Sequence, residues 1–318
     1  MKCVFFIVGP TATGKSELAA DVAREIGAEI VSADAFQIYR GLNLLTAKPD
    51  ASTLAQAPHY LIGTVPLIEE MNAEKYRRAA MRAIEEINWR GNLAIVVGGS
   101  GLYIKALTHG LASLPDSNSK LRAKLNAMSL SDLCSQLAEL DPETSQKIDL
   151  KNRRRVVRAL EISLLTGRPA SEALAGRNLS TEALAKADDT GKPASPIPAT
   201  GVFVFRDRNE LYERINQRTE MMFECGVIEE VHAAGRTSAT ASQMIGLREI
   251  RELLAGKKSL PQCIAEIQQA TRRYAKRQLT WFRRQTNFPP LNLSFLTHNE
   301  AVKWISLRML SEVGTKDD

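Results

Sequence analysis

The sequence predicts an α/β protein with a parallel sheet at its core, helices on both faces of the sheet and an all-helical insertion. Three observations favour this fold. Short apolar segments typical of buried strands alternate with amphipathic segments of helical periodicity. The first strand leads directly into a glycine-rich turn at residues 9–16. Between residues 115 and 197 the strand signal disappears, and Ala, Leu, Lys and Glu recur at helical spacing.

The N-terminal segment contains a phosphate-binding motif. Residues 3–8 are apolar, β-branched or aromatic and predict a buried strand, while residues 17–26 have the periodicity of an amphipathic helix. Between them lie Gly9, Pro10, Thr11, Ala12, Thr13, Gly14, Lys15 and Ser16. A strand, GxxxxGKS and a helix in that order form a P-loop, whereas an ordinary glycine-rich turn would lack this pattern. The core is therefore predicted to be P-loop NTPase-like.

The residue types of this loop indicate its chemistry. Its glycines allow consecutive N–H groups to point at one anion, and the helix that follows adds its positive end. Lys15 would contact the outer phosphate, and the Ser16 hydroxyl is the usual ligand of Mg²⁺ in such loops. We therefore expect a site for a diphosphate or triphosphate, with Mg²⁺ as cofactor.

Composition limits the other possibilities. With 318 residues, 44% of them hydrophobic, the chain can bury a large core. The four cysteines are far apart and the four histidines form no cluster, which argues against a zinc site or a disulfide framework and predicts a reducing, cytoplasmic location. We expect no signal peptide and no membrane span. The net charge of +6 and the pI of about 9.1 are only mildly basic.

A second predicted strand, residues 28–34, ends in Asp34. Ligands of parallel α/β sheets lie beyond the carboxyl ends of the strands, so this carboxylate is expected to face the phosphate loop. It could hold Mg²⁺ or accept a proton from a nucleophile. It could equally serve as the N-cap of residues 35–40, and the local sequence does not decide between these roles.

The rest of the first half continues the α/β pattern. Residues 36–50 form a loop that could line a substrate entrance or pack Tyr39 and Leu42 on the core. Strands are predicted at 59–65 and 93–97, around a helix at 73–90 whose charged residues form a solvated face. The last of these strands ends in GGSG and a helix at 102–107, where a nucleotide hydrolase would normally have an Asp. This turn could admit a ligand close to the backbone or simply begin the helix.

The helical block predicts three segments: a core from 1 to 115, an insertion from 116 to 198, and the second part of the core from 199 to 318. Residues 180–200 are rich in Pro, Ser and Asp and predict a return linker. Within the insertion, RRRVVRALEI would place apolar side chains inward and Arg154, Arg155 and Arg158 on a neighbouring face.

After the insertion, residues 201–205 predict a strand and 209–225 a helix. This helix carries Arg214 and Arg218 four residues apart. Two guanidinium groups on one face could neutralise a leaving diphosphate, or they could pair with neighbouring glutamates; both interpretations remain open.

Residues 270–284 predict a basic helix with interleaved aromatic residues. Its sequence, ATRRYAKRQLTWFRR, contains no acidic residue. Basic groups among aromatics suit a nucleic-acid backbone and unstacked bases, although a solvated basic face with its aromatics in the core is the alternative.

Together these motifs resemble the tRNA dimethylallyltransferase family, also called tRNA isopentenyltransferases. The matching segments occur in the family's order across nearly the whole chain. They are GPTATGKS, the SxDxxQIYRGL…TAKP block at 32–49, GGSGLYIKAL, RRRVVRALEI, ELYERINQR, MIGLREI and AKRQLTWFRR. The P-loop alone would be shared with a very large superfamily, but the set is highly specific.

The resemblance implies transfer of a dimethylallyl group from dimethylallyl diphosphate to N6 of adenosine 37 in tRNAs that read codons beginning with U. The loop would then hold a prenyl diphosphate and not ATP. Lys15 and Arg214 would act in catalysis with Asp34, the general base, and Arg218 would also bind diphosphate. The resemblance leaves open whether Arg214 or Arg218 assists departure of the diphosphate. The tRNA anticodon stem-loop would contact Asp34, Ala35, Phe36, Gln37, Ser100, Arg122, Arg154, Arg155, Arg158, Met244, Gly246, Arg248, Lys276, Arg277, Gln278, Trp281 and Arg283. A monomer is expected.

Some positions depart from the family's pattern. Ala35 replaces a usual Ser, Ser100 a usual Thr and Leu247 a usual Tyr, and residues 43–45 differ from a usual Asp-Ile-Gly. These departures leave open a weakly active relative. An ATP-dependent small-molecule kinase would need a magnesium-binding Asp after a later strand, and a non-catalytic RNA-binding module would not need a complete phosphate loop.

Overall fold

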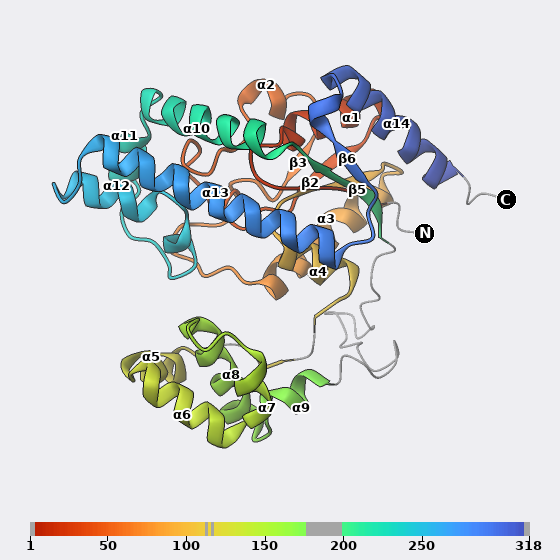
Figure 1. The fold of residues 1–318 in the computed structure, drawn as a ribbon. Coiled ribbons are helices and arrows are strands. Elements are labelled where there is room, and N and C mark those ends of the chain that lie inside the picture. The colour runs from red at the N-terminus through yellow and green to blue at the C-terminus, as the bar shows by residue number, and fades with distance from the viewer. Residues whose placement is uncertain (1–3, 112–113, 116–117, 176–198, 315–318) are drawn as a thin grey trace. The chain divides into compact units, whose positions relative to one another are not determined.

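The computed structural model describes residues 4–111, 114–115, 118–175 and 199–314 (Figure 1). Its centre is a six-stranded sheet in the order β3-β2-β4-β1-β5-β6. All of the strand pairs are parallel. The strands are β1 Val4–Val8, β2 Glu29–Ser32, β3 His59–Tyr60, β4 Ala94–Gly98, β5 Thr200–Phe205 and β6 Pro290–Asn292. The predicted α/β class with a parallel sheet is confirmed.

The central strand β1 explains where the site lies. It pairs with β4 on one side and β5 on the other, so the chain first extends the sheet in one direction and later in the other. Ligands of parallel sheets bind at such a change of direction, outside the carboxyl ends of the strands. Every residue of β1 and β4 is buried, as expected for strands covered on both faces.

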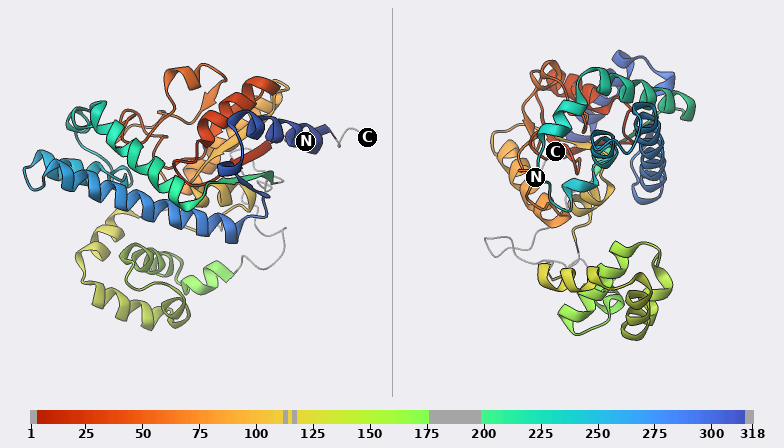
Figure 2. Two further views of the ribbon diagram at one scale, coloured as in Figure 1. Left: turned by 45° about the horizontal axis from the view of Figure 1, so that its top comes forward. Right: turned by 90° about the vertical axis from the view of Figure 1, so that its left-hand side faces the viewer.

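Helices cover both faces, as Figures 1 and 2 show. The helices around the sheet are α1 Lys15–Ile26, α2 Ala51–Leu54, α3 Ala73–Trp89, α4 Gly101–Thr108, α10 Arg208–Glu224, α11 Val227–Ala233, α12 Leu247–Leu254, α13 Leu260–Gln285 and α14 His298–Gly314, with short 3₁₀ turns η1 Ala241–Gln243 and η2 Leu293–Phe295. Alternate residues of β1 belong to different hydrophobic clusters: Phe6 shares one with residues of α3, α4, α12 and α13, and Phe5 shares the other with residues of α1 and α14.

The contacts divide the chain into two compact units. The first comprises residues 1–109 and 196–318, and the second residues 110–195. The second unit is helical: α5 Ser119–Ala127, α6 Leu130–Leu140, α7 Pro142–Lys147, α8 Arg153–Thr166 and α9 Ala170–Ala175. Its own core includes Leu133, Leu137, Val156 and Leu160. The expected insertion of residues 116–198 overlaps this unit, but most of its expected linker lies outside the described residues.

Several elements differ from the expected ranges. The strand predicted at 59–65 ends at Tyr60, because Leu61 and Gly63 both adopt positive φ angles. The basic helix predicted at 270–284 is the second half of the longer α13, which begins with a Ser259 capping box. The sequence pattern predicts neither β6 nor α14. No helix in the described part of the chain is both long enough and apolar enough to cross a membrane.

Candidate active site at the phosphate loop

The glycine-rich turn connects β1 to α1 and has the backbone of an anion-binding loop. Gly14 precedes α1 with a φ of 88°, a left-handed conformation that glycine adopts without strain. Ala12 also lies in this region, with a φ of 64°. A side chain at Gly9 would place its Cβ 2.2 Å from the Val204 carbonyl oxygen. Close packing against β5 therefore requires a glycine at the start of the loop.

Hydrogen bonds within the loop hold Lys15 at its centre. The Lys15 ammonium donates to the Pro10 carbonyl at 3.1 Å, and the Thr13 hydroxyl donates to the same oxygen at 3.0 Å. Burial lowers the pKa of Lys15 to about 8; the nearby Asp34 carboxylate opposes this shift and Arg218 adds to it. An incoming anion would favour the charged amine, so this lysine is suited to bind a phosphate.

Three arginines hold successive residues of the loop. Arg218 donates to the Thr11 hydroxyl at 2.9 Å, and the Nε atoms of Arg214 and Arg206 donate to the carbonyls of Ala12 at 2.8 Å and Thr13 at 2.9 Å. The interpretation that Arg214 and Arg218 face the phosphate loop is therefore supported over pairing with glutamates of their own helix. Burial lowers the pKa of Arg218, with Asp34 opposing the shift and Arg214 adding to it.

Arg206 is a site residue that the sequence motifs do not single out. It follows β5 directly, and residues at the carboxyl ends of parallel strands commonly lie near the ligand. This position is the feature of the sequence from which its role could have been predicted. Besides contacting Thr13, it forms an ion pair with Glu210 and donates to the Leu293 carbonyl at 3.1 Å. It therefore connects the phosphate loop to the segment that follows β6.

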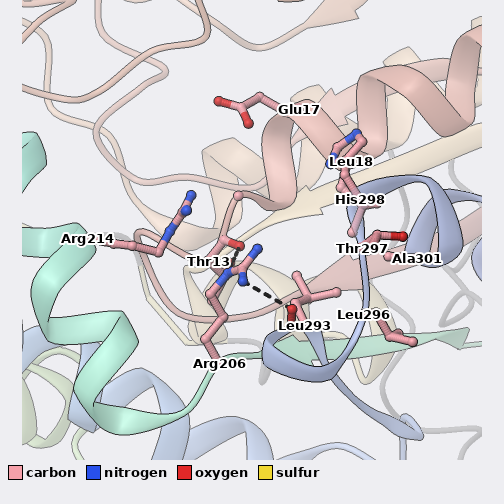
Figure 3. A pocket seen from close by; sticks show the side chains of 11 residues that line it. Thr13, Glu17, Leu18, Arg206, Arg214, Leu293, Leu296, Thr297, His298 and Ala301 are labelled. Atoms are coloured by element: carbon pink, nitrogen blue, oxygen red, sulfur yellow. Dashed lines mark hydrogen bonds between the residues drawn. The ribbon is translucent and has the colours of Figure 1, made fainter.

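Consecutive loop residues line two different pockets. Thr13 and Gly14 face a pocket of about 210 Å³ shared with Arg206 and Arg214, which Figure 3 shows reaching it from the end of β5 and from α10. The other residues of this pocket are Glu17, Leu18, Leu293, Leu296, Thr297, His298 and Ala301. Lys15 and Ser16 face a second, much smaller pocket of about 20 Å³, together with Ser32, Asp34 and Gln37.

Asp34 contributes to a turn and also faces the second pocket. Its Oδ1 accepts the backbone N–H groups of Phe36 at 2.9 Å and Gln37 at 3.2 Å. The Asp34 side chain therefore accepts backbone N–H groups as a capping residue does, although residues 35–38 form turns and no helix. Both of these hydrogen bonds use Oδ1, so Oδ2 remains available to a ligand in the pocket that contains Lys15 and Ser16. The two roles that the sequence left open are therefore compatible.

The oxygen groups of this second pocket are compatible with Mg²⁺. Ser16, Ser32 and Asp34 line it, and hydroxyl and carboxylate oxygens are the hard ligands that Mg²⁺ prefers. Across the described residues no group of three or more His, Cys, Asp or Glu could hold a metal without other ligands. Mg²⁺ at phosphate sites commonly uses only one or two protein ligands plus phosphate oxygens and water, which this donor set can accommodate.

The GGSG turn is shaped by the protein's own packing. A Cβ at Gly98 would lie 2.2 Å from the Ala33 carbonyl oxygen, and a Cβ at Gly101 would lie 2.4 Å from the Trp281 ring. These glycines therefore allow close contact with the residue that follows β2 and with α13; Gly98 also lines the second pocket, so the approach of a ligand to this turn stays a prediction. Ser100 accepts the Ala35 N–H on its Oγ at 2.9 Å, a contact that the usual Thr hydroxyl could also make.

The second half of α13 has two distinct faces. Arg273, Lys276, Arg277 and Arg283 are exposed on the outer face. On the inner face Trp281 packs edge-on against Phe282, with ring centroids 5.0 Å apart. Gln278 is only 5% exposed and contacts the phosphate loop, so its side chain is not on the surface with the arginines. The expectation that it contacts tRNA directly does not fit this burial.

Other expected RNA-contacting residues also differ in accessibility. Met244 is 3% and Leu247 1% exposed, so their side chains belong to the core, and Gly246 is buried at the start of α12 with a φ of 96°. Arg248 is exposed and pairs with Glu249 at 2.8 Å. Of these expected contacts, Arg248 alone has an exposed side chain.

In the helical unit, Arg154 and Arg155 are exposed at the start of α8. Arg122 and Arg158 instead pair with Glu161, at 2.9 and 2.6 Å. Glu161 is fully buried; burial favours its neutral form, but the hydrogen bonds from both arginines outweigh this and lower its pKa. Arg122 and Arg158 therefore stabilise the unit, whatever contact they also make with RNA.

Comparison with known proteins agrees with this arrangement. The IPP transferase family profile matches residues 37–285. A tRNA dimethylallyltransferase from Akkermansia muciniphila is 40% identical over 309 residues, covering 97% of this chain and 99% of that protein. One from Geobacter sulfurreducens is 38% identical over 307 residues, covering 94% and 90%.

Solved structures give the same result. The full-length tRNA isopentenylpyrophosphate transferase of Bacillus halodurans superposes with a TM-score of 0.71 at 31% identity, covering 99% of this chain and 98% of that one. A eukaryotic dimethylallyltransferase acting on tRNA superposes with a TM-score of 0.76 at 24% identity, covering 99% and 79%, and supports the fold alone. With a phosphate loop, a facing carboxylate and these relatives, the chain belongs to the IPP transferase family.

Proposed function

We propose that the protein transfers a dimethylallyl group from dimethylallyl diphosphate to N6 of adenosine 37 in tRNAs that read codons beginning with U. The products are N6-(dimethylallyl)adenosine and diphosphate. The observation that carries the proposal is the second pocket, where Asp34 lies with Lys15 and Ser16 at the end of a complete phosphate loop. The reaction needs an anion cradle and a base side by side, and the residues that line this pocket supply both groups.

The first task is to stabilise the leaving diphosphate. The allylic carbon of the donor ionises readily once its leaving group is neutralised. The loop N–H groups, Lys15 and Arg218 would supply that neutralisation from groups already fixed by hydrogen bonds. Mg²⁺, when bound, would be held by Ser16 and the diphosphate oxygens and would add positive charge at the same place.

The second task is to activate the adenine amine. Its lone pair is drawn into the ring, so the amine is a poor nucleophile. The Asp34 carboxylate would accept one N–H through Oδ2 and take the proton as the C–N bond forms. Because Oδ1 is fixed by two backbone N–H groups, Oδ2 has a defined direction. The base itself would be splayed out of the anticodon loop, which single-stranded loops allow at low cost.

RNA binding is assigned to the exposed cations of α13, with Arg248 on α12 and Arg154 and Arg155 on α8. We also expect a monomer in the cytoplasm. The test of the function is incubation with radiolabelled dimethylallyl diphosphate and unmodified tRNA, followed by nucleoside analysis. Label in N6-(dimethylallyl)adenosine is the expected result. A chain that leaves adenosine 37 of every candidate tRNA unchanged, and prefers ATP to the prenyl donor, would contradict the assignment.

Removing two cations from the outer face of α13 should weaken RNA binding by an electrostatic mechanism. For Arg273→Gln with Lys276→Gln, we expect the slope of log Kd against log salt concentration to fall by roughly 1.4, about 0.7 for each phosphate of single-stranded RNA that is no longer neutralised. Filter binding of tRNA across a salt series measures this slope. Lys303→Gln, an exposed lysine on α14, is the control. An unchanged slope in the double variant would remove α13 from the RNA interface.

The pKa of Lys15 predicts a pH dependence of donor binding. Burial lowers this pKa to about 8 in the free protein, while a bound diphosphate would raise it. Below about pH 8 the amine is already charged, so affinity should be constant. Above it, binding must take up a proton, and affinity should fall by up to about tenfold per pH unit. The donor's phosphates are largely ionised at pH 7 and fully so above pH 8, where the decline is expected, since a phosphate ester has a second pKa of about 6.

Isothermal titration calorimetry with dimethylallyl diphosphate between pH 7 and 9.5 would measure this fall in donor affinity. Lys15→Arg is the matched variant, because a guanidinium keeps its charge throughout the range. We expect that variant to bind more weakly at neutral pH but to lose the decline above about pH 8. A decline of equal steepness in both proteins would assign it to another group.

A further inference from the structure

Gln278 connects the RNA-facing helix α13 to the phosphate loop. Its Oε1 accepts the Thr11 N–H at 2.9 Å, and its Nε2 donates to the Gly99 carbonyl at 2.8 Å. The side chain is 5% exposed. Both ends of the amide are thus engaged in the interior, while the cations of the same helix point outward.

The surroundings of Gln278 are built to accept it. A Cβ at Gly99 would lie 2.3 Å from Nε2, so only glycine at that position allows the amide to approach. The Gly9 N–H donates to the Gly98 carbonyl at 3.3 Å, which joins the start of the phosphate loop to the same turn. Arg218 holds the Thr11 hydroxyl on the other side. The backbone and the side chain of Thr11 are therefore fixed by two different helices.

The contacts of Thr11 determine which backbone N–H groups of the phosphate loop can bind an anion. The Thr11 N–H points to Gln278, so it is not among the N–H groups offered to an anion. Fixing it sets the direction in which the chain enters the left-handed Ala12, and hence the orientation of the following N–H groups. Preorganised donors bind an anion better than donors that must first be ordered.

We propose that Gln278 is a positioning residue that orders the phosphate loop for the prenyl diphosphate, and that it is not a contact of the tRNA. The inference rests on the proposed function, since it names the ligand of that same loop. It predicts separate effects on the two substrates. Losing the amide should weaken donor binding and leave RNA binding nearly unchanged, although Gln278 lies among the residues of a basic helix.

The test is Gln278→Met in the full-length chain, because methionine keeps the length and volume but forms neither hydrogen bond. We expect the Kd and KM for dimethylallyl diphosphate to rise by about tenfold, since the variant cannot form either hydrogen bond to the backbone. The Kd for tRNA should change by less than twofold. Amide hydrogen exchange of residues 9–16 should quicken while the melting temperature stays close to that of the unsubstituted chain. Gln269→Met, an exposed position on α13, is the matched control and should alter none of these.

A second variant keeps the inference falsifiable if the first does not fold. Gly99→Ala places a Cβ 2.3 Å from the Gln278 amide and only 3.1 Å from the Gly9 carbonyl oxygen, so it displaces the amide with a smaller push on the loop itself and should reproduce the same pattern. Combining it with Gln278→Met should cost little more than either change, because both disrupt the same contact of the Gln278 amide with the loop and the turn. Weaker tRNA binding with unaltered donor binding and loop exchange would overturn the inference and make Gln278 an RNA contact. Quicker exchange throughout the chain, with both affinities unchanged, would also overturn it and leave only a packing role.

Donor binding and loop exchange are measured without RNA, which separates this inference from the function. If the unsubstituted chain binds the donor and shows the loop response but never modifies tRNA, the proposed transfer fails and the positioning role stands. If the transfer occurs but Gln278→Met binds the donor normally, the positioning role fails alone. No binding of dimethylallyl diphosphate by the unsubstituted chain would overturn both.

Discussion

Asp34→Asn is expected to lower the kcat of prenyl transfer by about 10²–10⁴-fold, the usual contribution of a positioned general base. The amide oxygen of asparagine can still accept the N–H groups of Phe36 and Gln37, so the turn that follows β2 should survive. What the variant lacks is the second carboxylate oxygen that would accept the proton of the adenine amine. The affinity for tRNA and for the donor should change little.

Asp34→Ala separates chemistry from structure. It removes both the base and the turn's acceptor, so it should show the same loss of kcat together with a lower free energy of unfolding. The structural part should be about 2 kcal/mol, roughly 1 kcal/mol for each of the two hydrogen bonds that Oδ1 accepts. Single-turnover kinetics on bound tRNA measure the chemical step, and thermal melting measures stability. If the asparagine variant transferred the prenyl group at the rate of the unsubstituted chain, Asp34 would be only a turn residue.

The sequence predicts the parts of this site that depend on local pattern. The phosphate loop follows from strand, GxxxxGKS and helix, and Asp34 follows from its place at the end of the next strand. The parallel sheet follows from the alternation of apolar runs with helical periodicity. Each of these features depends on residues that are close together in the chain, and for this reason the sequence alone predicts it.

What the sequence does not predict depends on contacts between distant segments. Arg206 reaches Thr13 only because β5 lies beside β1, and Gln278 reaches Thr11 across 267 residues of chain. Helical spacing alone cannot tell which face of α13 is buried, so the sequence groups Gln278 with the exposed cations around it. Met244 is likewise expected at an RNA surface although its side chain fills the core. Short β6 has too little local pattern to be recognised.

Arg218→Met is expected to lower kcat by about 10²–10³-fold, which corresponds to about 2.7–4 kcal/mol of transition-state stabilisation. Arg218 and Arg214 lie one turn apart on α10, but their environments differ. Arg218 interacts electrostatically with Lys15 and Asp34, which line the second pocket, whereas Arg214 lines the other pocket with Arg206. Charge that develops on a diphosphate held beside Asp34 should therefore depend more on Arg218. For Arg214→Met we expect a loss of no more than about tenfold.

The same variant has a second signature that a packing defect would not produce. Arg218 lowers the pKa of Lys15, so removing its charge should raise that pKa and move the decline in donor affinity to higher pH. Arg208→Met, at an exposed position of α10 where the guanidinium lies over the Tyr212 ring, is the control. Suppose instead that the Arg214 and Arg218 variants lose kcat equally and that donor affinity begins to fall at the same pH as in the unsubstituted chain. The two arginines would then neutralise the diphosphate jointly. A loss confined to the Arg214 variant would place the leaving group in the pocket of Figure 3 and away from Asp34.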